Sequence, residues 1–216
     1  EALLRWRDGA GELVPPEVFI PVAESAGVIN KLTERVLELV CHDAGHFLAG
    51  HPGFHVAINL SPADLQSTVI VGLLDKLMSR CGAGPSNLIV EITERGFVHR
   101  DSAREVIAAL HARGIEVAID DFGTGYSSLA YLATLPLDYL KIDRSLVQDV
   151  VADRRRRAVV EGVLAIAAAL SLETIAEGVE TEAQRALLAG RGCTHYQGFL
   201  CAEPLDDAAL IALVVN

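Results

Sequence analysis

The feature that most constrains the fold is a repeated alternation of short apolar strands with amphipathic helices. Six strands are predicted at residues 55–60, 88–93, 116–119, 139–143, 173–179 and 193–200, and a seventh is expected at 1–6. Helical patterns stand between them, with no linker, low-complexity segment or sequence repeat. Helix caps are predicted at Asn30, at Asp153, and at Thr181 with Gln184 as its capping-box partner. This order is typical of parallel β-α-β units. The apolar content of 51% fits strands that helices cover on both faces.

Two architectures accommodate such units: an open doubly wound sheet and a closed (β/α)8 barrel. No glycine-rich dinucleotide-binding fingerprint supports the open sheet. A barrel needs eight strands and typically about 250 residues, whereas this chain offers seven strands in 216 residues. The deficit lies at the start, where the chain begins almost directly on a strand. We therefore expect an α/β fold, a TIM-like (β/α)8 barrel whose N-terminal strand is missing from this chain.

A polar side chain stands at or near the end of each predicted strand. The set comprises Glu1, Asn59, Glu91 with Glu94, Asp120 with Asp121, Lys141, Glu177 with Glu180, and Gln197. Any one of them is explained by capping of the next helix, but seven such positions in succession are not. In a barrel, the carboxyl ends of the strands meet on the face that holds active sites. We expect these side chains to converge there.

The chemistry of this set indicates divalent metal ions. Asp120 and Asp121 are adjacent acids that repel each other and favour a nearby cation. Carboxylate and amide oxygens suit Mg²⁺ or Mn²⁺ and exclude a thiolate zinc site. The carboxylates outnumber the needs of one ion, so we predict two ions bridged by the Asp pair. Two such ions activate a water for in-line displacement at phosphorus, and Lys141 orients that water or offsets phosphate charge.

The net charge and the cysteine content limit which partners the protein can bind and which cellular compartment it occupies. The net charge of −11 disfavours DNA, RNA and anionic membranes as partners. The four cysteines show no CxxC spacing, so we expect them to be reduced and mostly buried. No apolar stretch reaches the roughly 18 residues that a membrane span needs. We expect a cytoplasmic protein, or the cytoplasmic domain of a membrane-anchored one.

Taken together, the strand-end motifs resemble those of the EAL domain family, bacterial phosphodiesterases that act on cyclic di-GMP. The motifs that carry the resemblance are Glu1-Ala-Leu-Leu-Arg, Asn59-Leu-Ser-Pro, Glu91-Ile-Thr-Glu94, Asp120-Asp-Phe-Gly-Thr-Gly, Lys141-Ile-Asp, Glu177-Gly-Val-Glu180 and Gln197-Gly-Phe. They cover the whole chain in the family's order. The resemblance implies a modified TIM barrel with an antiparallel first strand, and metal-dependent hydrolysis of cyclic di-GMP to linear pGpG.

The resemblance also implies roles for the metal-binding side chains. Four would ligate a first ion: Glu1, Asn59, Glu91 and Asp120. Asp120 would bridge to a second ion that also takes Asp121 and Glu177. Glu177 is alternatively the general base, and the sequence leaves that choice open. Lys141 would contact the nucleophilic water, and Glu180 would support the waters of the second ion.

Further roles implied by the resemblance concern substrate and assembly. Arg5 would contact a substrate phosphate, Leu3 would line the pocket, and Gln197 would support the substrate. Glu94 would anchor the loop 122–128, which couples metal binding to a homodimer interface. An upstream sensor or signalling domain is expected in the full-length protein, with residues 1–216 forming the N-terminally truncated EAL phosphodiesterase domain.

Departures from the family pattern are few, and two other functions stay open. Cys201 and Glu203 stand where an aromatic and a basic residue are common, so that rim of the site binds differently. One alternative is a cyclic di-GMP-binding effector with little or no turnover. The other is an unrelated metal-dependent phosphoesterase barrel. The complete set of expected ligands favours the phosphodiesterase.

Overall fold

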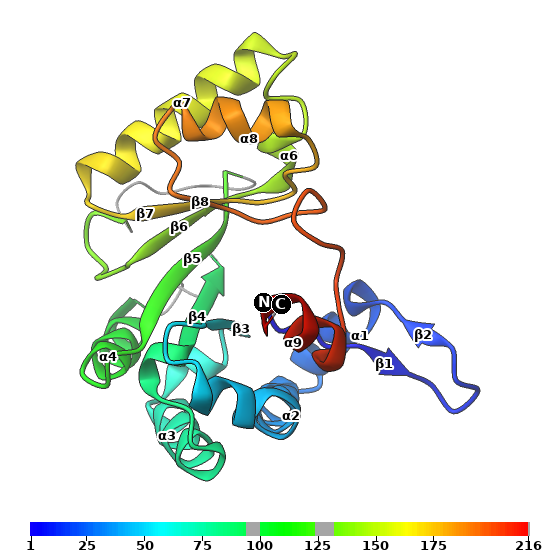
Figure 1. The fold of residues 1–216 in the computed structure, drawn as a ribbon. Helices are drawn as coiled ribbons and strands as arrows, with labels where there is room; N and C mark the ends of the chain where they lie inside the picture. Colours follow the sequence, from blue (N-terminus) through cyan, green and yellow to red (C-terminus); the bar gives the residue numbers. More distant parts are fainter. Residues whose placement is uncertain (94–99, 124–131, 216) are drawn as a thin grey trace. The chain divides into compact units, whose positions relative to one another are not determined.

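The structure, a computed structural model, describes residues 1–93, 100–123 and 132–215. The chain divides into two compact units, Glu1–Ile115 and Glu116–Asn216. Each unit combines parallel strands with helices (Figure 1), so the expected α/β class is confirmed. Two sequence predictions, the anchor Glu94 and most of the loop 122–128, lie outside the described residues.

The first unit contains a short antiparallel hairpin, two parallel strands and several helices. Its elements in chain order are β1 (Trp6–Arg7), β2 (Leu13–Val14), α1 (Pro16–Ser25), α2 (Ile29–Gly50), β3 (Val56–Leu60), η1 (Asp64–Gln66), α3 (Val69–Cys81), η2 (Pro85–Asn87), β4 (Leu88–Thr93) and α4 (Arg100–His111). Strands β3 and β4 pair in parallel, and Asn59 lies opposite Glu91. The two predicted metal ligands therefore sit side by side at the carboxyl end of this pair.

Helices α2 and α3 cover these strands with apolar side chains. Leu48 and Leu74 are almost completely buried, as is Ile58 on β3. The helices come close together at Gly45, where a Cβ would lie 2.5 Å from the Cβ of Cys81. A larger residue at position 45 would therefore separate α2 from α3.

A buried carboxylate fixes the turn that follows β3. Asp64 is 3% exposed and accepts hydrogen bonds from Asn30 Nδ2 at 2.7 Å, Thr33 Oγ1 at 2.8 Å, and Ser61 N and Oγ at 2.9 and 2.6 Å. Asn30 was expected to cap α2, but the helix starts one residue earlier and the Asn30 side chain bonds Asp64 instead. Asp64 thus ties α2 to the turn two residues after Asn59.

The second unit contains a parallel sheet with helices between its strands. Its elements are β5 (Glu116–Phe122), β6 (Tyr139–Ile142), α6 (Arg144–Val147), α7 (Arg154–Ala169), β7 (Glu173–Ala176), α8 (Glu182–Ala189), β8 (His195–Tyr196) and α9 (Asp207–Val215). The strands pair in parallel and in sequential order. Sequential parallel pairing is the arrangement that β-α-β units require.

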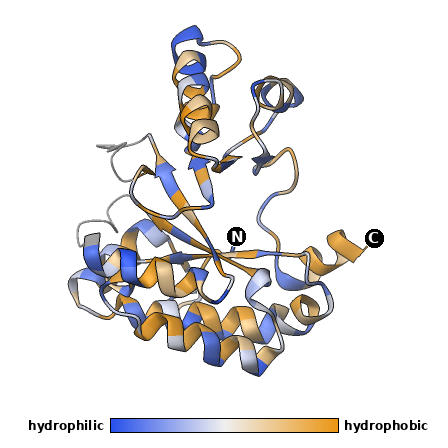
Figure 2. Cartoon of the chain, turned by 90° about the vertical axis from the view of Figure 1, so that its left-hand side faces the viewer, coloured by the Kyte–Doolittle hydropathy of each residue, from blue (hydrophilic) through white to orange (hydrophobic). Residues whose placement is uncertain are grey.

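The helix caps of this unit agree with the sequence predictions. Asp153 Oδ1 accepts hydrogen bonds from the N–H groups of Arg155 and Arg156 at the start of α7. Thr181 and Gln184 form the predicted capping box of α8. The last helix, α9, is apolar along almost its whole length (Figure 2) and has no buried residue.

The structure differs from the predicted elements mainly at the two ends. The strand expected at residues 1–6 does not form: residues 1–5 have no regular secondary structure and β1 begins only at Trp6, although Ala2 N donates a hydrogen bond to Ala57 O of β3. The strand expected at residues 193–200 is reduced to the two residues of β8. Three of the cysteines are half-buried and Cys201 is exposed, so the expectation of mostly buried thiols is wrong. No helix among the described residues is long and apolar enough to cross a membrane.

Candidate metal centre

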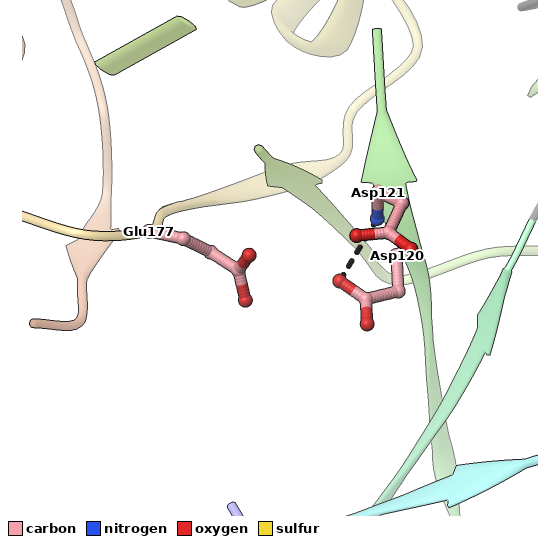
Figure 3. A group of neighbouring side chains, drawn as sticks. All are labelled: Asp120, Asp121 and Glu177. Carbon is pink, nitrogen blue, oxygen red and sulfur yellow. Dashed lines mark hydrogen bonds between the residues drawn. The ribbon is translucent and has the colours of Figure 1, made fainter. Parts of the chain in front are cut away.

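Three carboxylates of the second unit come together at the carboxyl ends of its strands. Asp120 and Asp121 lie at the end of β5, and Glu177 directly follows β7. One oxygen from each lies within 4.8 Å of the others. Figure 3 shows Glu177 extending toward the two aspartates, whose backbone and side chain are joined by a hydrogen bond from Asp121 N to Asp120 Oδ1 at 2.9 Å.

A local break in β5 explains how two adjacent residues serve one cluster. Successive side chains of a regular strand point to opposite faces. Here the register shifts, so that Asp120 and Asp121 together stand opposite one residue of β6, Lys141. Asp121 has a φ of 56°, the left-handed conformation that aspartate tolerates better than most residues. This β-bulge redirects the Asp121 side chain toward that of Asp120.

A buried lysine sits among these carboxylates. Lys141 is 1% exposed, and its Nζ lies 3.1 Å from Asp120 Oδ1 and 2.7 Å from Glu177 Oε1. Removal of an ammonium group from water is costly unless it is paired with opposite charge. The two carboxylates provide that pairing, and they hold Lys141 at the centre of the site.

The charge and chemistry of this group fit a divalent cation. Three carboxylates and one ammonium carry formal charges of −3 and +1, which leaves −2 within the group. All of the donors are carboxylate oxygens, the ligands that Mg²⁺ and Mn²⁺ prefer. Asp120 is buried and Glu177 is half-buried, so solvent screens their charges only in part. Asp120, Asp121 and Glu177 are therefore the residues that would hold such an ion.

Three predicted ligands belong to the first unit, and two of them are in contact. Asn59 Nδ2 donates a hydrogen bond to Glu1 Oε1 at 2.8 Å. Glu91, 2% exposed, lies opposite Asn59 in the β3–β4 pair. The structure thus groups Glu1, Asn59 and Glu91 at one strand end, and their role as ligands of the same ions stays a prediction.

The remaining predicted residues occupy strand ends or exposed positions. Gln197 is half-buried, and its backbone pairs with Ala176 O at 2.8 Å and Val179 N at 3.0 Å, which holds it beside the segment after β7. Glu180 is exposed. Leu3 is 45% exposed, and the guanidinium of the exposed Arg5 donates to Leu4 O. Their catalytic and substrate-binding roles stay predictions.

Sequence reasoning missed the residues that pack behind the cluster. Leu146 and Arg144 of α6 lie against Gly123 and Gly178, which closely follow the Asp pair and Glu177. A glycine shortly after each predicted ligand was the available signal. It did not identify the packing partner, because that partner comes from a different segment of the chain.

The structure also contains a cavity that is not lined by the carboxylates of the candidate metal centre. About 530 Å³ of space lies between α2 and α3, lined by Arg35, Glu38, Leu39, Cys41, His42, Asp43, Leu77 and Arg80. Its charges are largely paired internally, since Arg35 bonds Glu38 and His42 bonds Asp43. None of the predicted site residues lines it.

Comparison with known proteins identifies the family. The family model described as EAL domain matches residues 1–204. The chain belongs to the EAL domain family. The chain is 39% identical to the bifunctional diguanylate cyclase/cyclic di-GMP phosphodiesterase MucR of Pseudomonas aeruginosa, over 99% of this chain and 32% of that protein. It therefore spans about a third of the length of this curated relative.

Solved structures of EAL proteins share the fold. A structure of the PaMucR phosphodiesterase in complex with c-di-GMP matches with a TM-score of 0.88 and 38% identity, covering 96% of this chain and 85% of that chain. A manganese and cyclic di-GMP complex of Klebsiella pneumoniae BlrP1 matches with a TM-score of 0.80 and 32% identity, covering 93% and 50%. These likenesses confirm the expected α/β fold of the TIM-like barrel class.

Proposed function

We propose that this EAL domain hydrolyses cyclic di-GMP to linear pGpG with the help of two divalent ions. The observation that carries the proposal is the convergence of Asp120, Asp121 and Glu177 around the buried Lys141. Membership of the EAL family supports the reaction. The relative MucR is named as a cyclic di-GMP phosphodiesterase, and PaMucR and BlrP1 are complexed with that nucleotide in their solved structures.

The role assigned to each residue follows from the charge of its side chain. Divalent ions in such a site lower the pKa of a bound water and neutralise phosphate charge during phosphodiester hydrolysis. Asp120, Asp121 and Glu177 would hold them. Lys141, fixed by its two ion pairs, would orient the attacking water or stabilise charge that develops on the phosphate. Glu177 would serve as a ligand or as the general base.

The first unit would supply the remaining ligands of the first ion: Glu1, Asn59 and Glu91. Their clustering at one strand end supports this assignment. Arg5 would contact a substrate phosphate, Leu3 would line the nucleotide pocket, and Gln197 and Glu180 would support substrate and water. Exposure of Arg5 and Leu3 is consistent with contact to a ligand.

We also propose which ions the site binds and how the protein assembles. Mg²⁺ or Mn²⁺ would serve, and the manganese complex of BlrP1 supports the latter. We propose a homodimer in the cytoplasm, joined to an upstream sensor or signalling domain and without DNA or RNA as partner. The larger size of MucR supports the additional domain.

The decisive experiment follows the product. Purified protein is incubated with cyclic di-GMP and Mg²⁺ or Mn²⁺, and pGpG is measured by chromatography, with a chelator as the negative control. We expect pGpG only with the metal, and we expect Glu177→Ala to bind substrate without turnover. Tight binding without pGpG would instead identify a cyclic di-GMP effector. Faster cleavage of a generic diester such as bis-p-nitrophenyl phosphate would indicate a less specific phosphoesterase.

A further inference from the structure

We infer that the short helix α6 sets the separation between the carboxylates of β5 and β7, with Leu146 and Arg144 acting as positioning residues. This inference rests on the proposed function, because it concerns the metal site that the proposal assigns to these carboxylates. None of the strand-end motifs includes these two side chains. They lie in the segment that directly follows β6, the strand that carries Lys141.

Leu146 packs against the backbone that follows the Asp pair. Gly123 lies two residues after Asp121 and has a φ of +102°, which side chains rarely adopt. A Cβ at Gly123 would lie only 2.7 Å from Leu146 Cδ1. The Leu146 side chain thus occupies the space above this glycine and limits how far the end of β5 can move toward α6.

Arg144 packs in the same way behind Glu177. Gly178 directly follows Glu177 and has a φ of +65°. A Cβ there would lie 2.7, 3.0 and 3.2 Å from Cβ, Cγ and Cδ of Arg144. The aliphatic part of the Arg144 side chain therefore covers the Gly178 backbone, as long charged side chains often cover apolar surface.

Helix α6 is held firmly enough to act as a spacer between the two segments. Asp143 caps it by accepting a hydrogen bond from Ser145 N at 2.9 Å, and Arg156 of α7 donates to Ser145 O. Val147 is fully buried, and Gln184 Nε2 of α8 donates to Val147 O at 3.3 Å. The helix is thus anchored to α7 and α8 and packs against both ligand-bearing segments.

The arrangement links all three parts of the candidate site. Strand β6 presents Lys141, and the helix that follows it contacts the residue after Glu177 and the turn after Asp121. Groups that orient metal ligands influence metal affinity without touching the metal, and their substitution typically costs about 10–100-fold in affinity. Loss of the α6 contacts should therefore weaken metal binding although every ligand remains.

The test measures binding of Mn²⁺ alone, by the electron paramagnetic resonance signal of the free ion, with the whole chain. We expect Leu146→Ala to raise the Mn²⁺ dissociation constant by about tenfold, and Leu146→Met to stay near wild type because it refills the space. The matched control is Leu172→Ala, an equally half-buried leucine just before β7, at the end opposite Glu177. The control should bind Mn²⁺ like the wild type.

A second pair of variants separates packing from charge. Arg144→Ala should weaken Mn²⁺ binding, whereas Arg144→Met, which retains Cβ, Cγ and a similar length, should not. The two Arg144 variants also test the spacer role of α6 if Leu146→Ala fails to fold in a melting experiment. Wild-type Mn²⁺ affinity in both Leu146→Ala and Arg144→Ala would overturn the spacer role.

The result is separable from the proposed function. A wild type that hydrolyses cyclic di-GMP while both alanine variants bind Mn²⁺ normally would refute the spacer and leave the phosphodiesterase standing. A wild type that binds Mn²⁺ more tightly than the alanine variants but releases no pGpG would support the spacer and refute the phosphodiesterase. A wild type that does not bind Mn²⁺ would overturn both.

Discussion

Replacement of Lys141 by methionine should destabilise the second unit and uncouple metal binding from turnover. Methionine approximates the length of the lysine side chain but carries no charge. The ammonium is 1% exposed and pairs with Asp120 at 3.1 Å and Glu177 at 2.7 Å. Lys141→Met therefore leaves two neighbouring carboxylates without the cation that now lies between them.

The size of the effect follows from the burial of the three groups. Removal of one partner from a buried ion pair typically costs about 3–5 kcal/mol. The carboxylate side chains are 12% and 17% exposed, so solvent relieves part of the penalty, and we expect about 3 kcal/mol. For a chain of this size, each kcal/mol lowers the melting temperature by about 2–4 °C. The variant should therefore melt about 6–12 °C lower.

The assay is thermal unfolding in chelator and in Mn²⁺, beside a matched control. Lys76→Met removes the same charge from an exposed position on α3 and should change the melting temperature little. Mn²⁺ at 100 times its dissociation constant should return about 2.7 kcal/mol for each ion bound, because the ion binds the folded chain and not the unfolded one. Turnover should remain lost. A Lys141→Met variant that melts in chelator like Lys76→Met would refute the electrostatic reasoning.

Three further predictions concern backbone geometry, a buried carboxylate and a thiol. Gly178→Ala should lower the free energy of unfolding by about 1–2 kcal/mol, because of the left-handed φ at this position alone, and it should also abolish turnover. Gly162→Ala, in open space on α7, should keep the stability and the activity of the wild type in melting and product assays. Asp64→Ala leaves several buried donors without their acceptor and should lower the unfolding free energy by about 3 kcal/mol in urea titrations, and a loss below 1 kcal/mol would contradict the network. Burial and a neighbouring thiol raise the pKa of Cys41 from 9.0 to about 11, so at pH 8 its reactive thiolate is about 100-fold rarer than that of an ordinary thiol. Iodoacetamide should therefore label the exposed Cys201 before Cys41, as followed by mass spectrometry, and the labelling of Cys41 should rise as the pH approaches 11. Equal labelling rates of Cys41 and Cys201 at pH 8 would refute the raised pKa.

The sequence predicted the features that depend on local chemistry. The helix caps at Asp153 and Thr181 follow from side-chain hydrogen bonds to neighbouring N–H groups, and both are confirmed. The grouping of Asp120 with Glu177 follows from the rule that parallel strands end at one edge. These features need only the residues nearby and the direction of the strands.

Other features could not be predicted, because they depend on contacts between distant segments. The bulge at Asp121 is defined by its register against Lys141 on β6. Asparagine often caps helices, yet the Asn30 side chain donates a hydrogen bond to Asp64, 34 residues away. Propensity describes what a residue does alone, and tertiary partners redirect it.

The stoichiometry of Mn²⁺ tests the central claim most directly. Equilibrium titration of the wild-type chain should give two ions per chain, and Asp121→Gly should give one ion and no pGpG. Glycine is the appropriate substitution because it adopts the φ of 56° without strain, so only the carboxylate is lost. Two ions bound by both proteins, or fewer than two by the wild type, would contradict a two-ion centre in which Asp121 holds the second ion.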